Sequence, residues 1–276
     1  MSLRINNIST YSVERAMGQA STQFEHSVRA LASGNRITQA SDDAAGLAIG
    51  EQLRGELRGI RQAKMNAENA ASLTQVAEGS LNEQANILLR MRELGIQAAS
   101  DSVSDSERKY LNQEFTQLSS EFDRIAQTTA FGSKKLLAGN GSELEFHVGW
   151  QADSNNIIKL NLDGNSTASE VGIDGVEINS KSEARSSLKT IDSGLQKIAE
   201  VRAKYGAFQS RVEVARNALE VQYEGISEAH SRITDVDVAE ETANLVQARL
   251  KIDAGVSVMA QSLALPAAAN KLLSVL

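Results

Sequence analysis

The sequence predicts a mainly α-helical protein, with a long antiparallel coiled-coil bundle formed by its N- and C-terminal halves and a small β-hairpin lobe in the middle. Three observations support this prediction. Apolar residues recur every three or four positions over two very long stretches, aromatic residues make up only 4% of the 276 residues, and there is a single proline. This composition suits long helices packed side by side, because alanine permits their close approach.

Both ends of the chain carry an apolar stripe at helical spacing. We expect subunit–subunit packing through the main members of the two stripes, which are Val13, Met17, Ala20, Phe24, Leu31, Ile252, Val256, Met259, Leu263 and Leu272. Stripes of this kind need a partner, which is either the other stripe in a monomeric bundle or another copy of the chain. We favour other copies, and therefore an assembly subunit that exposes its ends as a monomer.

The inner part of the N-terminal half predicts one very long helix. Ser33-Gly34-Asn35 ends the first helix, and Ser41-Asp42-Asp43 begins the next, with carboxylates near the positive end of the helix dipole. An uninterrupted apolar stripe then runs from Ala45 to Ala98, which corresponds to a helix roughly 80 Å long. A helix of that length requires partners along its side, as in a coiled coil.

Two further helices complete the predicted bundle. Ser104-Asp105-Ser106-Glu107 forms a capping box, and the apolar residues that follow it up to Ile125 predict a helix that folds back on the long one. Helical spacing returns from about Ser182 to Ile233, which predicts a second long helix to match the first.

The middle of the chain has a different pattern. Residues 143–148 and 156–162 alternate or are β-branched, which predicts two short strands joined by turns rich in glycine and asparagine. Between Asn140 and Glu183, eight acidic residues face two basic ones, so this stretch holds −6 of the net charge of −7. An acidic middle stays solvated, whereas nearly neutral ends can pack against copies of themselves.

These patterns divide the chain into three parts. Residues 1–40 and 235–276 are predicted to form a terminal polymerisation coiled coil, the inner layer of an assembly. Residues 41–130 and 180–234 form a long-helix bundle, and residues 131–179 form a small β lobe of the same bundle domain.

Several classes of function find no support in the sequence. There is no cysteine, and the three histidines (His26, His147 and His230) are scattered, so we expect neither an enzyme nor a metal or cofactor site. Asp42-Asp43 fits a helix start better than a metal site. No basic stripe indicates nucleic-acid binding. The apolar C-terminal stretch contains Gln261, Asn270 and Lys271, so we expect no membrane insertion.

Particular motifs resemble bacterial flagellins over essentially the whole chain. They are Leu31-Ala-Ser-Gly-Asn-Arg-Ile37, Ser41-Asp-Asp-Ala-Ala-Gly-Leu-Ala-Ile49, Arg90-Met-Arg-Glu-Leu94, Ala130-Phe-Gly-Ser-Lys-Lys-Leu-Leu137 and Ile233-Thr-Asp-Val-Asp-Val-Ala-Glu-Glu241. Because the middle is short, the resemblance implies a short form with the inner two layers only. It also implies a structural subunit that polymerises into the flagellar filament for swimming motility.

Two alternatives stay open at this point. The hook–filament junction protein of the same superfamily is similar at both ends, but it commonly has a proline after the paired aspartates, where this chain has Ala44-Ala45. A chemoreceptor-like signalling coiled coil is also a long helical hairpin. It requires membrane helices ahead of the bundle and a helical tip, whereas the centre of this chain predicts strands.

The resemblance further implies partners and a location. It implies a secreted protein of the extracellular bacterial flagellum, exported without a cleaved signal peptide. Besides copies of itself, the implied partners are hook-associated and cap proteins and an export chaperone on the C-terminal segment. Arg90, Leu94, Gln97 and Glu114 match residues by which flagellins contact the animal Toll-like flagellin receptor. We expect the primary roles of Leu94 and Arg90 to be a stripe position and an ion-pair partner.

Overall fold

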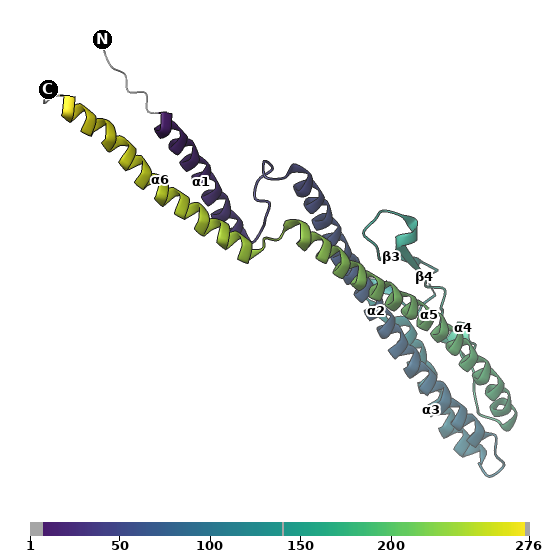
Figure 1. Cartoon of the computed structure of the whole chain (residues 1–276). Coiled ribbons are helices and arrows are strands. Elements are labelled where there is room, and N and C mark those ends of the chain that lie inside the picture. The colour runs from purple at the N-terminus through teal and green to yellow at the C-terminus, as the bar shows by residue number, and fades with distance from the viewer. Residues whose placement is uncertain (1–7, 140, 274–276) are drawn as a thin grey trace. The chain divides into compact units, whose positions relative to one another are not determined.

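The computed structural model describes residues 8–139 and 141–273, with the side chains of residues 8, 9, 263 and 265–273 left out. The helices are α1 (Ile8–Ser33), α2 (Ala44–Ala98), α3 (Asp105–Thr128), α4 (Ala168–Val171), α5 (Lys181–Thr234) and α6 (Val238–Leu273) (Figure 1). The strands are β1 (Ala130–Phe131), β2 (Lys134–Lys135), β3 (Glu143–His147) and β4 (Ile157–Asn161). The predicted fold class is confirmed: long helices with a small antiparallel hairpin, in which β3 pairs with β4.

The described residues form two compact units. One comprises residues 8–56 and 225–273, which we call the terminal unit, and the other comprises residues 57–224, which we call the bundle unit. The long helices α2 and α5 contribute to both units.

In the bundle unit, α2 and α5 run antiparallel. Lys64 pairs with Glu220 near one end, and Arg92 Nε donates to Asp192 Oδ1 over 2.8 Å towards the other. Buried positions on α2 recur with heptad spacing, and they are Ile60, Ala63, Ala67, Ala70, Leu73, Ala77, Leu81, Leu88, Met91, Leu94 and Ala98. The many alanines keep the neighbouring backbones close.

Helix α3 and the chain between α3 and α5, which we call the middle segment, complete this core. Phe115 and Phe122 of α3 are fully buried, as are Leu136, Leu137, Leu162, Ile173 and Ile178 of the middle segment. The buried Gln84 of α2 donates to the carbonyls of Phe122 and Ser166, over 3.1 Å each, and so connects all three segments. The middle segment therefore supplies core residues as well as the β3–β4 hairpin.

The glycine at position 194 permits a close approach inside the bundle unit. A Cβ atom at this position of α5 would lie 2.7 Å from Val171 Cγ1 on α4. Because real Cβ atoms do not approach so closely, a side chain at this position would push the short helix α4 away from α5.

In the terminal unit, α1 and α6 lie side by side (Figure 1). Asp43 Oδ1 accepts from Gly46 N over 2.8 Å and caps α2, as the sequence predicts. Asp237 Oδ1 caps α6 by accepting from Ala239 N over 2.8 Å. Two large apolar residues of this unit, Val28 of α1 and Ile49 of α2, are exposed.

Candidate functional site

The terminal stripes face each other across α1 and α6. Ala20 and Ala248 are buried, and Met17 lies so close to Gly255 that a Cβ atom there would be 2.5 Å from Met17 Cγ. Val13, Met17, Phe24, Leu31, Ile252 and Met259 are half-buried. Leu263 and Leu272 lie outside the described side chains. The stripes thus form the seam of a helix pair within one chain, and much of their surface remains accessible to water.

Helix α6 also carries exposed apolar residues. Val256, a member of the stripe, is 53% exposed, and outside the stripe Val246 is 56% exposed, Leu250 63% and Val258 48%. Val246, Leu250 and Val258 follow one another at intervals of four and eight positions, so they lie on one side of the helix, within about a third of its circumference. We call these three residues the outer face of α6. A helix that is apolar on several sides is typical of a segment buried by partners on several sides.

The two helices are joined to α2 and α5 through a short backbone ladder. Arg36 N donates to Thr234 O over 2.7 Å, and Val236 N donates to Gly34 O over 3.1 Å. The Arg36 guanidinium adds a bond of 2.9 Å to Ile233 O. Gly34 has a φ of +73°, a left-handed conformation that glycine adopts without strain. The turn after α1 and the turn before α6 are therefore held together.

The paired aspartates at the start of α2 have structural partners. Asp42 Oδ2 accepts from Thr38 N, Thr38 Oγ1 and Gln39 N over 2.9–3.0 Å. Burial works to raise the pKa of the Asp42 carboxyl. The bonds from Gln39 and Thr38 and the charge of His26 outweigh burial, so its pKa is lowered. In the described part of the chain, no three His, Cys, Asp or Glu side chains are placed to hold a metal ion together.

The residues matched to receptor binding lie on α2 and α3. Arg90 donates from Nε and Nη2 to Glu114 Oε1 over 3.0 and 2.8 Å, and from Nη1 to Glu93 over 3.0 Å. These bonds, above all those to Glu114, raise the pKa of Arg90. Gln97 is exposed, whereas Leu94 is buried in the core of the bundle unit. Arg90, Gln97 and Glu114 thus lie on the surface of the bundle unit, whereas Leu94 belongs to its core.

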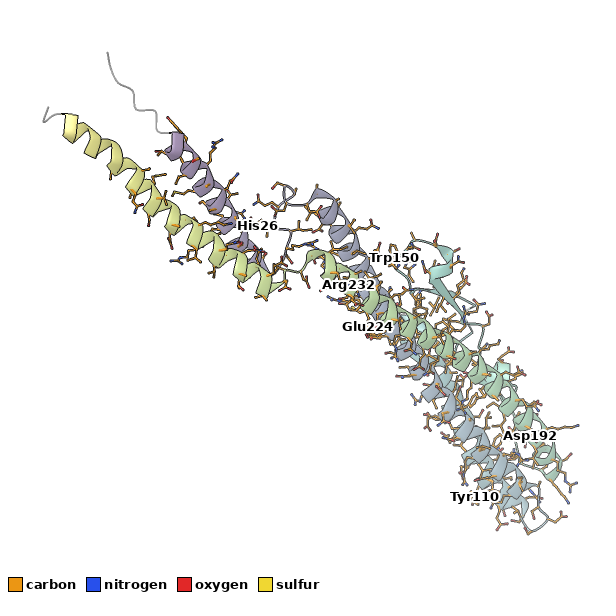
Figure 2. All side chains as sticks on the ribbon, viewed as in Figure 1. His26, Tyr110, Trp150, Asp192, Glu224 and Arg232 are labelled. Atoms are coloured by element: carbon orange, nitrogen blue, oxygen red, sulfur yellow. The ribbon has the colours of Figure 1, made fainter. Side chains whose placement is uncertain are left out.

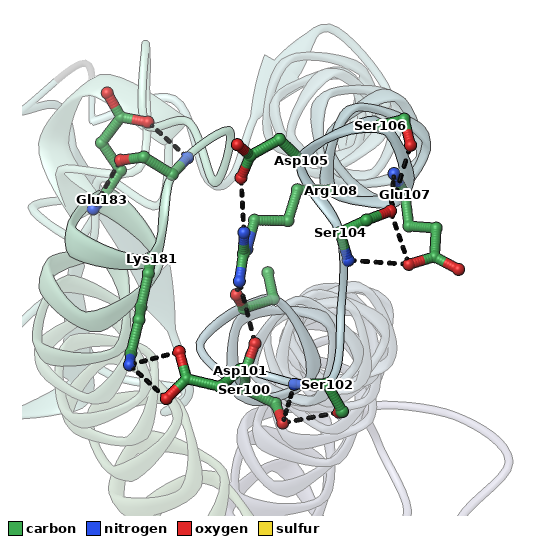
Figure 3. A network of polar contacts seen from close by, with 12 residues as sticks. Ser100, Asp101, Ser102, Ser104, Asp105, Ser106, Glu107, Arg108, Lys181 and Glu183 are labelled. Carbon is green, nitrogen blue, oxygen red and sulfur yellow. Dashed lines mark hydrogen bonds and ion pairs between the residues drawn. The ribbon is translucent and has the colours of Figure 1, made fainter.

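A polar network closes the end of the bundle unit where α2, α3 and α5 meet (Figure 3). The buried Arg108 donates to Ala98 O and Ser100 O over 2.8 and 2.9 Å, and pairs with Asp105. The predicted capping box is confirmed, because Ser104 and Glu107 bond reciprocally. The hydrogen bond and charge of Lys181 lower the pKa of Asp101 and tie the loop after α2 to α5.

Comparisons with known proteins identify the family. The model of the bacterial flagellin N-terminal helical region matches residues 5–142, and the model of the C-terminal helical region matches residues 188–273. The chain belongs to the bacterial flagellin family. It is 36% identical to a flagellin of Halalkalibacterium halodurans over 269 residues, which is 97% of this chain and 98% of the relative.

Further relatives agree with this family. A flagellar filament 30.7 kDa core protein of Treponema maltophilum is 34% identical over 272 residues, covering 93% of this chain and 94% of the relative. The crystal structure of a Bacillus cereus flagellin is 26% identical with a TM-score of 0.50, covering 56% of this chain and 88% of that one. The predicted resemblance is confirmed by these matches.

Membership in the flagellin family determines the broad function. Flagellins are structural proteins, and this chain is a self-polymerising subunit of the extracellular flagellar filament. The relatives are filament proteins, which favours this function over the hook–filament junction protein and the chemoreceptor-like hairpin. None of the helices, over the residues that the structure describes, is long and apolar enough to cross a membrane.

Proposed function

We propose that the terminal unit is the polymerising part of the chain. The seam between α1 and α6 holds the pair together within one subunit, and the outer face of α6 packs against neighbouring copies. Residues 1–40 and 235–276 form the inner layer of the filament, residues 41–130 and 180–234 form a surrounding layer of long helices, and residues 131–179 form a lobe of that layer. The observation that carries this proposal is the exposure of Val246, Leu250 and Val258.

Energetics support an interface at this place. Burying a side chain such as valine or leucine is worth about 1.5–3 kcal/mol, so the three residues of the outer face contribute several kcal/mol per copy before ordering costs. A filament requires a heterologous contact, in which one surface meets a different surface of the next copy and the rotation does not close. The half-buried seam of the next subunit offers a second apolar surface of this kind.

The same exposed surface accounts for the other partners in the proposal. An export chaperone would cover the C-terminal segment before assembly, because an apolar helix exposed in a monomer invites aggregation. Hook-associated and cap proteins would meet the terminal unit at the two ends of the filament. Export of an unfolded chain, without a cleaved signal peptide, suits a sequence that has no cysteine and therefore no disulfide to form.

A truncated chain tests the proposal. Residues 41–234 alone keep the whole bundle unit but lack α1 and α6. We expect a soluble, highly helical protein by circular dichroism that does not sediment as a polymer under conditions in which the full chain does. Filaments of the truncated chain in electron micrographs would contradict the proposal.

We also propose, from the resemblance and the exposure of the residues, that Arg90, Gln97 and Glu114 contact the animal Toll-like flagellin receptor, with Leu94 supporting them from the core. Arg90→Ala removes a charged donor, and loss of such a hydrogen bond costs about 1.5–3 kcal/mol, so receptor affinity should fall roughly tenfold to a hundredfold. Receptor signalling and binding would be measured on monomeric protein.

A matched variant controls for the loss of a surface charge. Arg124 is also an exposed arginine on the bundle unit and pairs with Glu121 over 2.6 Å, three residues earlier on α3. Arg124→Ala should leave receptor affinity unchanged. Unaltered signalling by Arg90→Ala would remove the claim of receptor contact.

A further inference from the structure

One histidine in the terminal unit stands between two carboxylates from different segments. His26 belongs to α1, at the place where this helix runs beside the start of α6 (Figure 2). Its Nε2 lies 3.7 Å from Asp42 Oδ2, in the segment between α1 and α2, and its Nδ1 lies 3.7 Å from Glu241 Oε1, in the first turn of α6. All three side chains are shielded, with exposed fractions of 26%, 18% and 13% respectively.

The contact between His26 and Glu241 is incomplete as it stands. Both His26 Nδ1 and Glu241 Oε1 are buried and have no hydrogen-bond partner among the described atoms. The other oxygen of Glu241 accepts from Asn244 Nδ2 over 3.4 Å, which leaves Oε1 for the imidazole. Two buried polar atoms without partners are costly, and they face each other just beyond hydrogen-bond length.

Protonation decides whether both contacts can form at once. A neutral imidazole carries one N–H, so it can donate to one of the two carboxylates and presents a lone pair to the other. The imidazolium has an N–H on each nitrogen and therefore donates to both Asp42 and Glu241. Each distance must shorten by about 0.8–1.0 Å to reach the length of a charge-assisted hydrogen bond, so both carboxylates would move towards the ring.

Other charged groups near the cluster have different partners. On α1, Arg29 pairs with Glu25 over 4.0 Å. Between α1 and α2, the Arg36 guanidinium bonds Ile233 O and Asp43 caps α2. For the residues that the structure describes, Asp42 and Glu241 are the acidic groups with an oxygen within 4.0 Å of the imidazole.

Polar groups at the start of α6 and the end of α5 also have partners of their own. At the start of α6, Asp237 caps the helix, and Glu240 donates its N–H to the Asp237 carboxylate over 3.2 Å. On α5, the ring of His230 lies 3.3 Å from Thr234 Oγ1. The described lysines and arginines form no ion pair with Asp42 or Glu241. The imidazolium of His26 would therefore be the cation that pairs with both carboxylates.

We propose that His26 is a proton-dependent latch, which in its charged form ties α1, the segment before α2 and the first turn of α6 together. The latch orders the terminal unit at mildly acidic pH. It loosens as the pH rises through the range in which imidazole loses its proton, because one carboxylate then faces a lone pair. Asp42 keeps its charge at the acidic end of this range, since its carboxylate accepts three further hydrogen bonds.

Hydrogen–deuterium exchange of the full chain tests the latch. Protection of α1, of residues 34–43 and of the first turns of α6 would be measured at about pH 5.5 and about pH 8. Each rate is referred to the intrinsic exchange rate at the same pH. Two partly exposed ion pairs predict protection that is roughly threefold to tenfold higher at the acidic pH.

Four variants give the test its specificity. His26→Gln should abolish the pH dependence, and His230→Gln, which removes a histidine from the same unit, should retain it. His26→Arg keeps a planar cation at all these pH values, so its terminal unit should be equally protected at both. Glu241→Gln should reduce the effect, because it removes one of the two carboxylates.

The outcomes separate the latch from the proposed function. Exchange is measured on monomer and on sedimented polymer, and sedimentation itself reports polymerisation. A wild-type chain that forms no polymer contradicts the proposed function but still tests the latch in the monomer. Equal protection at both pH values, pH dependence that survives His26→Gln, or no protection of these segments in either form would overturn the latch.

Discussion

Introducing two carboxylates on the outer face of α6, with Val246→Asp and Leu250→Asp, is expected to abolish filament formation. Both side chains are more than half exposed in the single chain, so the substitutions leave the α1–α6 seam and the bundle unit intact. In an apolar interface, however, each carboxylate would lose its water without gaining a partner, at a cost of several kcal/mol. Sedimentation and electron microscopy measure the polymer, and circular dichroism and thermal unfolding measure the monomer.

A variant at the same two positions separates apolar character from side-chain identity. Val246→Leu combined with Leu250→Met keeps the face apolar with a similar total volume, so it should still polymerise. Filaments formed by the double aspartate variant would show that this face is exposed to solvent in the polymer. The interface would then have to lie on another part of the terminal unit.

The outer face could not be found by following a single stripe. On α6, the most regular repeat of apolar residues at three- and four-residue spacing is the seam, which includes Ile252 and Met259. Val246, Leu250 and Val258 lie on another side of the same helix. The sequence indicates this second surface only through apolar residues on more than one side of α6. An ordinary surface helix has one buried apolar face and one solvent-exposed polar face.

Much of the fold could be predicted because it is encoded locally. The heptad positions of α2 and α5, the aspartate at the start of α2 and the box of Ser104 and Glu107 each depend on residues within a turn or two. The pairing of β3 with β4 follows from alternation and from turns rich in glycine and asparagine. These features are found where the sequence predicts them.

Contacts between distant segments could not be predicted in this way. The hydroxyl of Tyr205 on α5 donates to Leu136 O over 2.7 Å, and burial raises its pKa to about 12. Gln84 reaches Ser166, and His26 meets Asp42 and Glu241. The neighbouring sequence does not distinguish these polar groups, and the packing of the helices determines which residue each of them contacts. The spacing of apolar residues predicts which face of a helix is buried, but not which residue of another segment lies against that face.

Of the residues matched to receptor binding, Arg90 and Glu114 are bonded to each other, because the antiparallel α3 brings Glu114 to Arg90. Leu94 is different, since its stripe position buries it completely. A substitution of Leu94 would therefore disturb the core first, and any effect on a partner would be indirect.

The network at the end of the bundle unit gives the second large prediction, because Arg108 is an almost buried cation with carbonyl partners. It satisfies Ala98 O at the negative C-terminal end of α2 and Ser100 O in the following loop. Arg108→Ala would leave these carbonyls without their donor. Since hydrogen bonds to a charged group are worth about 1.5–3 kcal/mol, we expect the free energy of unfolding of the bundle unit to fall by about 2–4 kcal/mol.

Denaturant unfolding followed by circular dichroism measures this loss, with Lys109→Ala as the control. Lys109 is the next residue of α3 and is exposed, so its removal should change stability by less than about 0.5 kcal/mol. Arg108→Lys should fall in between, because an ammonium group keeps the charge but cannot span both carbonyls as the guanidinium fork does. If Arg108→Ala were as stable as the wild type, water would have to replace the guanidinium at both carbonyls. The network would then order the loop without stabilising the helices that it joins.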